Sequence, residues 1–229
     1  MYDLNAASSH SPAGTRKEPR MGNLVVVDHP LIKHKMTFLR SKFTDVHMFR
    51  ELMRELSMLL AYEATHTIPV EETYCETPLM KAKGYMISGQ LIALIPILRA
   101  GLGMVDGLLS FMPMAKVGHV GLYRDHETLQ PVEYYCKLPA NIADMDVFIL
   151  DPMLATGGST VKAIDIVKSK GARRIRFMCI VSCPEGIATL QKAHPDVDIY
   201  TCTVDEKLNE HGYILPGLGD AGDRLYGTK

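Results

Sequence analysis

The sequence predicts an α/β protein with an open, mostly parallel sheet flanked by helices. Two observations lead to this prediction. Short apolar runs alternate with helical patterns along the chain, and the segment Val147–Thr160 joins a buried strand to a helix through a loop of small residues. Repeated strand–helix–strand units build parallel sheets with right-handed crossovers. With 229 residues, 47% of them hydrophobic, the chain can bury a substantial core.

Local patterns place the individual elements. Apolar residues recur at helical spacing over 45–64 with charged residues on the opposite face, and Thr44 or Asp45 can cap this helix. Pro96 is awkward in a central strand and indicates a bulge or a strand end within 91–98. The other predicted elements are strands at 24–27, 116–123, 147–150, 175–182 and 197–204 and helices at 102–112, 161–170 and near 186–194.

Three further segments lie outside this alternation. Residues 124–137, together with 116–123, are expected to form a protruding hairpin. The tail, 205–229, is rich in glycine and shows no helical or strand period, but its apolar residues indicate that it packs on the protein. Residues 1–20 are polar and lack the apolar stretch of a signal peptide, so we expect a disordered extension or leader before a single domain at 21–229.

Composition excludes several classes of protein. The net charge of −1 and the pI near 6.7 predict no nucleic-acid partner, and the apolar runs are too short or too interrupted to span a membrane. The five cysteines include no C-x-x-C pair, which argues against a zinc site and a disulfide framework. They are typical of small buried residues in a reducing compartment, and we expect a cytoplasmic protein.

The segment Val147–Thr160 has the features of a site for a phosphorylated sugar. Its apolar strand ends at Asp151, where a carboxylate can accept hydrogen bonds from ribose hydroxyls. The loop of Gly, Ser and Thr that follows opens a helix, whose free N–H groups and positive end attract phosphate. The segment matches neither the Walker A pattern nor Gly-x-Gly-x-x-Gly. The alternative is an ordinary strand–turn–helix.

Two arginines are expected at the same edge of the sheet as this loop. Arg99 and Arg124 each follow a predicted strand, and the guanidinium fork suits phosphate oxygens. Either arginine alone is typical of a surface salt bridge. Together with the loop they favour a substrate that carries two phosphate groups.

Residues 22–229 resemble the uracil phosphoribosyltransferases, which belong to the type I phosphoribosyltransferase group. The Asp151–Pro152 pair is the pattern of the uracil enzymes, and the tail motif is specific to them. The resemblance implies a phosphoribosyltransferase-like fold with a small hood built from the N-terminal and C-terminal parts and a β-hairpin arm. It rests on five segments in the order of that family, at 28–40, 95–107, 117–125, 151–160 and 211–224.

The resemblance implies an enzyme that makes UMP and diphosphate from uracil and 5-phosphoribosyl-1-diphosphate (PRPP). Catalytic roles fall to Arg99, Asp151 and Asp220, where Asp220 either orients uracil or removes its ring proton. Uracil binds Ile214, Gly219, Asp220 and Ala221, largely through backbone groups, which a glycine-rich loop can bring within reach of the base. The implied PRPP-binding residues are Arg99, Arg124, Asp151, Pro152, Met153, Leu154, Ala155, Thr156, Gly157, Gly158, Ser159 and Asp220.

The family also implies partners and a cofactor. Mg²⁺ is expected to arrive mainly on PRPP, with Asp220 near the metal end and without a protein ligand set. A homodimer or homotetramer is expected, with the helix at 45–64 and the hairpin at 117–137 as contacts, and GTP activates some members. Two alternatives remain: a non-catalytic PRPP-sensing regulator that binds RNA, against which the near-neutral charge counts, and a generic nucleotide-binding protein, against which the tail counts.

Overall fold

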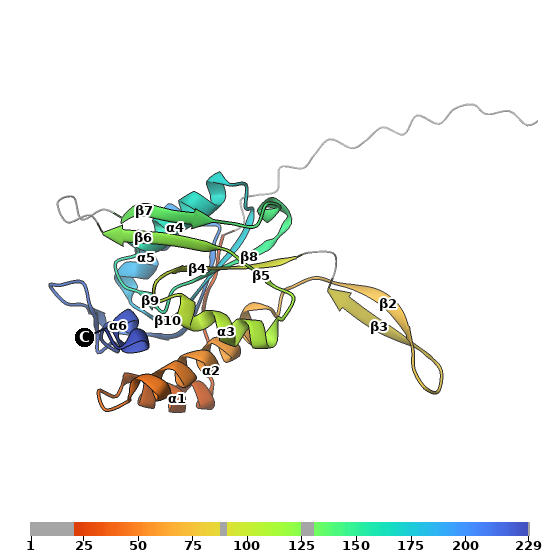
Figure 1. Cartoon of the computed structure of the whole chain (residues 1–229), viewed down its shortest axis with the longest axis horizontal. Coiled ribbons are helices and arrows are strands. Elements are labelled where there is room, and N and C mark those ends of the chain that lie inside the picture. Colours follow the sequence, from red (N-terminus) through yellow and green to blue (C-terminus); the bar gives the residue numbers. More distant parts are fainter. Residues whose placement is uncertain (1–20, 88–90, 125–130, 229) are drawn as a thin grey trace, which may run out of the picture.

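A mostly parallel sheet forms the centre of the molecule (Figure 1). The computed structural model describes residues 21–87, 91–124 and 131–228. The strands run in the order β1-β11-β10-β8-β4-β6-β7, with β5 beside β4 and β9 beside β10, and only the β6–β7 pairing is antiparallel among them. Their bounds are β1 Leu24–Val26, β4 Ile92–Leu98, β5 Lys116–Val117, β6 His119–Arg124, β7 Pro131–Lys137, β8 Asp146–Leu150, β9 Met153–Leu154, β10 Arg174–Ser182 and β11 Asp198–Val204.

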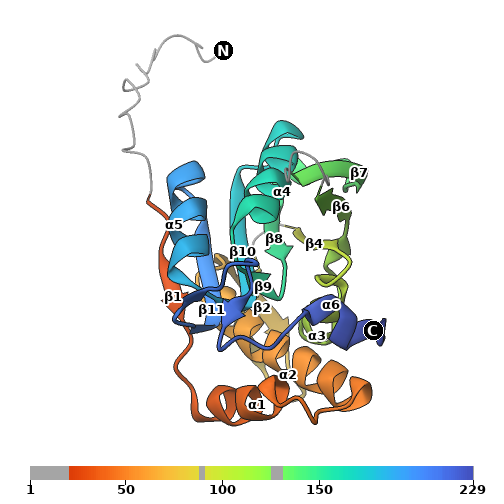
Figure 2. The same cartoon turned by 90° about the vertical axis from the view of Figure 1, so that its left-hand side faces the viewer.

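Helices cover both faces of this sheet (Figure 2). On one face, α1, α2 and α3 share a core with Leu94 and Phe148, and on the other α4 and α5 share a core with Ile95 and Ile149. Neighbouring strand residues point to opposite faces, so the buried strands are largely apolar on both faces. Arg176 of β10 is a buried exception that is paired with Asp146 of β8. The fold class predicted from the sequence is confirmed. The helices are α1 Pro30–Arg40, α2 Val46–Ala64, α3 Leu102–Phe111, α4 Gly158–Ser169, α5 Pro184–Ala193 and α6 Ala221–Tyr226, with a short 3₁₀ turn at Ile142–Asp144.

Most predicted elements form within a few residues of their expected bounds. Asp45 caps α2, since its Oδ1 accepts a hydrogen bond of 2.8 Å from the N–H of Met48. The prediction of a bulge or a strand end at Pro96 was wrong, because β4 continues to Leu98 and its pairing with β8 has no register shift up to Pro96. Pro96 pairs with Leu150 of β8 and lies where the neighbour on the other side changes from β5 to β6.

The projecting arm is not the hairpin that the sequence singled out. β6 and β7 do form the expected antiparallel pair, but this pair extends the edge of the central sheet. A separate two-stranded sheet, β2 (Val70–Glu76) with β3 (Lys81–Ile87), reaches away from the body (Figure 1). The sequence reading assigned no structure to this region, whose residues are largely exposed on both faces.

The tail is more regular than expected. β12 (Lys207–Leu208) pairs with β13 (Ile214–Leu215), and α6 follows, so the prediction of no regular structure was wrong. The prediction that the tail packs on the protein is confirmed, because Ile214, Leu218 and Leu225 are buried. Helix α1 was also unexpected; His29 caps it by accepting a hydrogen bond from the N–H of Leu31.

Within the described residues, no helix combines the length and apolarity that crossing a membrane requires.

Candidate functional site

Asp151 stands at the carboxyl end of β8, where the loop toward α4 begins. Its Oδ1 accepts a hydrogen bond of 3.2 Å from the N–H of Met153. Loss of solvation raises the pKa of the Asp151 carboxyl to about 7, and the hydrogen bond from Met153 opposes this only in part. The group therefore changes charge near neutral pH, which is common at functional sites.

The loop after Asp151 leads directly into α4. Helix α4 begins at Gly158, three residues before the predicted start at 161, so Ser159 belongs to its first turn. Gly157 precedes it in a left-handed conformation (φ 82°), and no side chain caps the helix. The backbone N–H groups of this turn can therefore serve an anion.

Not every predicted loop residue can offer its side chain to a ligand. Pro152 and Leu154 are buried. The carbonyl of Pro152 accepts hydrogen bonds of 3.0 Å from Ile180 and Val181, and the Leu154 side chain packs in the core beneath α4 and α5. Pro152 and Leu154 thus anchor the loop to the core of the protein. A ligand in the pocket would therefore contact the backbone of the loop and not these two side chains.

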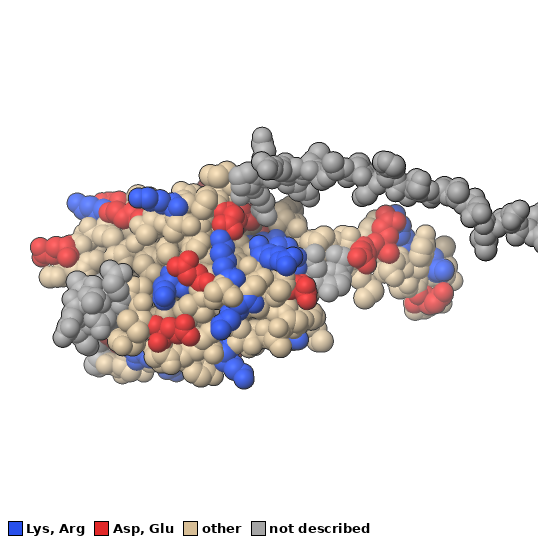
Figure 3. Space-filling model, turned by 90° about the horizontal axis from the view of Figure 1, so that it is seen from above, with Lys and Arg blue, Asp and Glu red and all other residues tan. Residues whose placement is uncertain are grey.

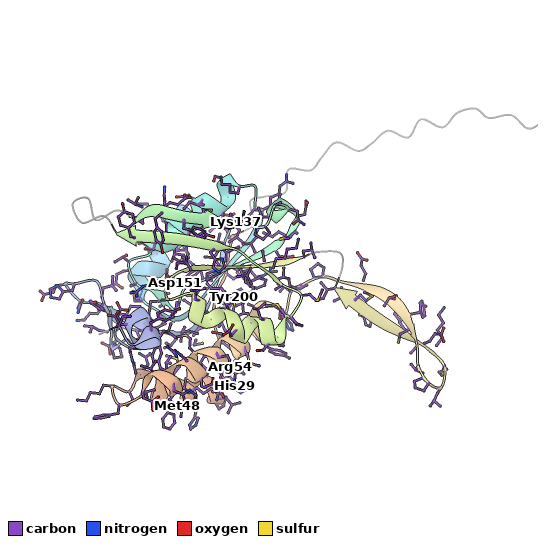
Figure 4. The ribbon with its side chains drawn as sticks, in the orientation of Figure 1. His29, Met48, Arg54, Lys137, Asp151 and Tyr200 are labelled. Atoms are coloured by element: carbon purple, nitrogen blue, oxygen red, sulfur yellow. The ribbon has the colours of Figure 1, made fainter. Side chains whose placement is uncertain are left out.

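A pocket of about 230 Å³ joins the loop to the tail. Asp151 lies at the end of the sheet, on the side where the tail crosses (Figure 4). The structure thus brings together the predicted PRPP loop and the predicted uracil residues, which are about 60 residues apart in sequence. The pocket is lined by Ala100, Asp151, Met153, Ala155, Gly212, Tyr213, Ile214, Gly219, Asp220, Ala221 and Gly222.

Asp220 both lines this pocket and starts the last helix. Its Oδ1 accepts a hydrogen bond of 2.9 Å from the N–H of Asp223 and so caps α6. Among the described residues, the other carboxylate oxygen has no hydrogen-bond partner. Gly219, just before it, has φ 82°, a conformation that residues with a side chain rarely adopt. The local backbone is therefore built around glycine at the point where it faces the pocket.

Arg99 follows β4 after a cis peptide bond and directly precedes Ala100, which lines the pocket. Its guanidinium Nη2 is 3.8 Å from Asp223 Oδ1, and the side chain is 60% exposed. Such an exposed pair is weak, so the guanidinium remains able to bind another anion. A Cβ on Gly222 would lie 3.9 Å from Arg99 Nη2, which places the arginine beside the tail. Arg124 ends β6, but its side chain lies outside what the structure describes.

Two arginines without a predicted role hold the tail in place. Arg40 donates hydrogen bonds to Asp205 Oδ2 (2.7 Å) and to the carbonyl of Gly217 (2.6 Å). Arg224 donates to the carbonyls of Leu39, Leu218 and Ser41 at 2.6–2.8 Å. Arg40 and Arg224 are the last residues of the segments 28–40 and 211–224, which carry the family resemblance. Their place in these segments was the one sequence feature that could have indicated a role for them. The hydrogen bonds of these two arginines join α1 to the tail, which are the N-terminal and C-terminal parts of the expected hood.

The site has no ready-made protein ligand set for a metal. Within the described ranges, no group of three or more His, Cys, Asp or Glu side chains is close enough to hold an ion. Asp220 offers a single carboxylate oxygen at the pocket wall. This donor set suits a cation that arrives on a phosphorylated ligand and keeps most of its water.

Comparison with known proteins gives one consistent result. A family model described as uracil phosphoribosyltransferase matches residues 26–228. A uracil phosphoribosyltransferase of Clostridium perfringens is 61% identical over 209 residues, covering 91% of this chain and all of that protein. One from a Geobacillus strain is 59% identical over the same length. Among solved structures, the AQ2163 protein from Aquifex aeolicus is similar with a TM-score of 0.85 and 39% identity, covering 90% of this chain and 99% of that one.

Proposed function

The chain belongs to the uracil phosphoribosyltransferase family, and we propose that the pocket between Asp151 and the tail is its active site. The enzyme transfers the 5-phosphoribosyl group of PRPP to uracil and releases UMP and diphosphate. One observation carries the assignment of the site: a single pocket is walled by the strand end with its phosphate-type loop and by the glycine-rich tail.

The PRPP end of the proposed site is the sheet edge. The backbone N–H groups of Ala155–Ser159 and the start of α4 receive the 5′-phosphate. Asp151 accepts hydrogen bonds from the ribose hydroxyls, and its negative charge faces the sugar ring. Arg99, exposed at the rim, binds the diphosphate. Arg124, at the end of β6, is assigned the same role.

The uracil end is the tail. The backbone of Gly219–Ala221 and of Ile214 offers N–H and C=O groups to the alternating acceptors and donor of the base edge. Cytosine would place its amine donor opposite a donor of the site. Leaving such a group buried and unpaired costs roughly 1–3 kcal/mol, which favours uracil.

Catalysis at this site rests on positioning and on charge. We propose that the bond from ribose to diphosphate breaks early, so that positive charge develops on the ring close to Asp151. Asp220 holds the base in line or takes its proton, and its cap to α6 fixes the carboxylate. Mg²⁺, when bound, would neutralise charge on the diphosphate, and the carboxylate oxygen of Asp220 that does not cap α6 would help to hold it.

Substituting Arg99 tests the diphosphate end. Arg99→Ala should raise the KM for PRPP about tenfold and leave the KM for uracil nearly unchanged, because a charge-assisted hydrogen bond contributes roughly 1.5–3 kcal/mol. Initial-rate kinetics with each substrate varied in turn measures both constants. Arg173→Ala, at an exposed position beyond α4, is the control. An effect on the KM for uracil alone would show that Arg99 acts at the uracil end of the site and not at the diphosphate end.

We further propose that the protein assembles as a homodimer or larger oligomer, through the arm formed by β2 and β3. The arm exposes apolar side chains that a monomer would leave in water, and Leu79 at its tip is 94% exposed. The other exposed apolar residues on the arm are Val70, Tyr74, Met80, Tyr85, Met86 and Ile87.

Charged substitutions at the tip test this contact. The double variant Leu79→Glu/Met80→Glu should shift the protein to a lower oligomer in analytical ultracentrifugation, because burying two carboxylates in an interface is unfavourable. Phe43→Glu, at a position 86% exposed and outside the arm, is the control. An unchanged sedimentation coefficient in the double variant would remove the tip from the interface. Addition of GTP in the same experiment tests whether this effector acts on assembly.

The assignment as a whole is tested by UMP formation from labelled uracil with PRPP and Mg²⁺.

RNA binding without UMP formation would support the regulator instead. On the face seen in Figure 3, Lys and Arg side chains lie interspersed with Asp and Glu, which does not favour a polyanion there.

A further inference from the structure

The first turn of α5 contacts the proposed PRPP loop through the backbone carbonyls of the loop. Cys183, buried at the start of this helix, donates a hydrogen bond of 3.3 Å from its N–H to the carbonyl of Leu154. Its Sγ donates to the carbonyl of Ala155 at 3.2 Å. Two consecutive carbonyls of the loop are therefore held by one residue outside the loop.

Gly186, in the first turn of α5, allows this contact to be close. A Cβ at that position would lie 2.5 Å from the Leu154 carbonyl oxygen and closer still to that of Ala155. Real Cβ atoms do not approach carbonyl oxygens so closely. Any side chain here would push the loop and the helix apart.

These contacts set the direction of the loop's N–H groups. In a planar trans peptide the C=O and the N–H of the next residue point in opposite directions. Because the carbonyls of Leu154 and Ala155 point at α5, the N–H groups of Ala155 and Thr156 point away from it. These two groups belong to the proposed phosphate cradle.

The same turn also reaches the tail. Glu185 Oε1 accepts a hydrogen bond of 3.1 Å from the N–H of Leu208 in β12. Leu208 pairs with Ile214 in β13, which lines the pocket at the uracil end. One turn of one helix thus contacts both substrate loops.

On the basis of the proposed function, we propose that the first turn of α5 positions both substrate loops of the enzyme. Cys183 and Gly186 orient the backbone that binds the PRPP phosphate, and Glu185 orients the β12–β13 hairpin that leads to the uracil residues. None of the three contacts substrate, so they are positioning residues.

The PRPP side is tested by calorimetry of PRPP–Mg²⁺ binding. Cys183→Ala should weaken binding about two- to fivefold, the effect of one weak hydrogen bond, and Cys183→Ser should restore it because a hydroxyl can donate to Ala155. Gly186→Ala should weaken it more, by about tenfold. Cys202→Ala removes a buried thiol of β11, outside the two proposed substrate loops, and is the matched control. Cys183→Ala is the informative variant if Gly186→Ala does not fold.

The uracil side is tested by steady-state kinetics. Glu185→Ala should raise the KM for uracil about two- to fivefold without changing PRPP binding, and Glu185→Gln, which keeps an acceptor oxygen, should restore it. Effects on different substrates from residues two positions apart cannot arise from a general loss of stability.

The outcomes separate this proposal from the assignment of function. Equal changes in the constants of both substrates, or melting shifts with unchanged constants, would overturn the positioning role. A wild-type enzyme that makes no UMP would overturn the proposed function instead, while PRPP calorimetry would still report on Cys183 and Gly186.

Discussion

Gly219→Val should lower kcat/KM for uracil on the order of a hundredfold or more, while PRPP binding largely survives. Gly219 has φ 82°, where a β-branched residue is strained, so the valine would force the backbone to rearrange. The proposed contacts to uracil are made by the backbone of this segment. A displacement of about 1 Å in a catalytic geometry can cost about a hundredfold in rate.

A matched variant isolates position from strain. Gly171 also has a positive φ, of 98°, but lies after α4 away from the pocket. Gly171→Val should lower the melting temperature and leave uracil kinetics nearly unchanged. Uracil-saturation kinetics and PRPP calorimetry on both variants give the comparison. Normal uracil kinetics in Gly219→Val would remove the tail from the proposed site.

Asp151→Asn should lower kcat/KM for PRPP roughly a hundredfold, because two charge-assisted hydrogen bonds to the ribose weaken. It should also remove a pH dependence. With the pKa of Asp151 at about 7, PRPP affinity in the wild type rises with pH through neutrality as the carboxyl ionises, and the asparagine variant lacks this rise. Calorimetry from pH 6 to 8 on both proteins measures it.

The same substitution should stabilise the protein at high pH. The folded pKa of about 7 lies above the ordinary value of 3.8, so the folded protein holds a proton that the unfolded chain has lost. The free energy of unfolding of the wild type therefore falls as pH rises from about 4 to 7, by on the order of a few kcal/mol. Asp151→Asn should show a smaller fall. Asp144→Asn, an exposed control, should behave as wild type in denaturant unfolding at each pH; if Asp151→Asn does too, the carboxyl is not desolvated.

The sequence predicts the sheet well because its strands are buried on both faces. Segments such as 147–150 and 177–181 are apolar throughout, and alternation with helices then determines a parallel order. The PRPP loop could be predicted for the same reason, since Asp151 and the glycines at 157 and 158 follow such a buried strand.

The elements that were missed have no clear pattern of apolar residues in the sequence. Helix α1 has a mixed pattern, and α6 is only six residues long, so neither shows a clear period. The arm has exposed residues on both faces, and its polar sequence does not alternate with a buried set. Arg40 and Arg224 could not be assigned because most of their acceptors lie far away in the sequence.

The hood of α1 and tail has a consequence for synthesis of the enzyme. Arg224 donates to the carbonyl of Leu39 across 185 residues of chain, and Arg40 donates to that of Gly217 across 177. The strands of the central sheet all precede the tail, so we expect the sheet to form before the tail is made and the uracil pocket to form only after it. A chain that lacks residues 205–228 is therefore expected to fold its sheet but to lack the residues that form the uracil end of the pocket.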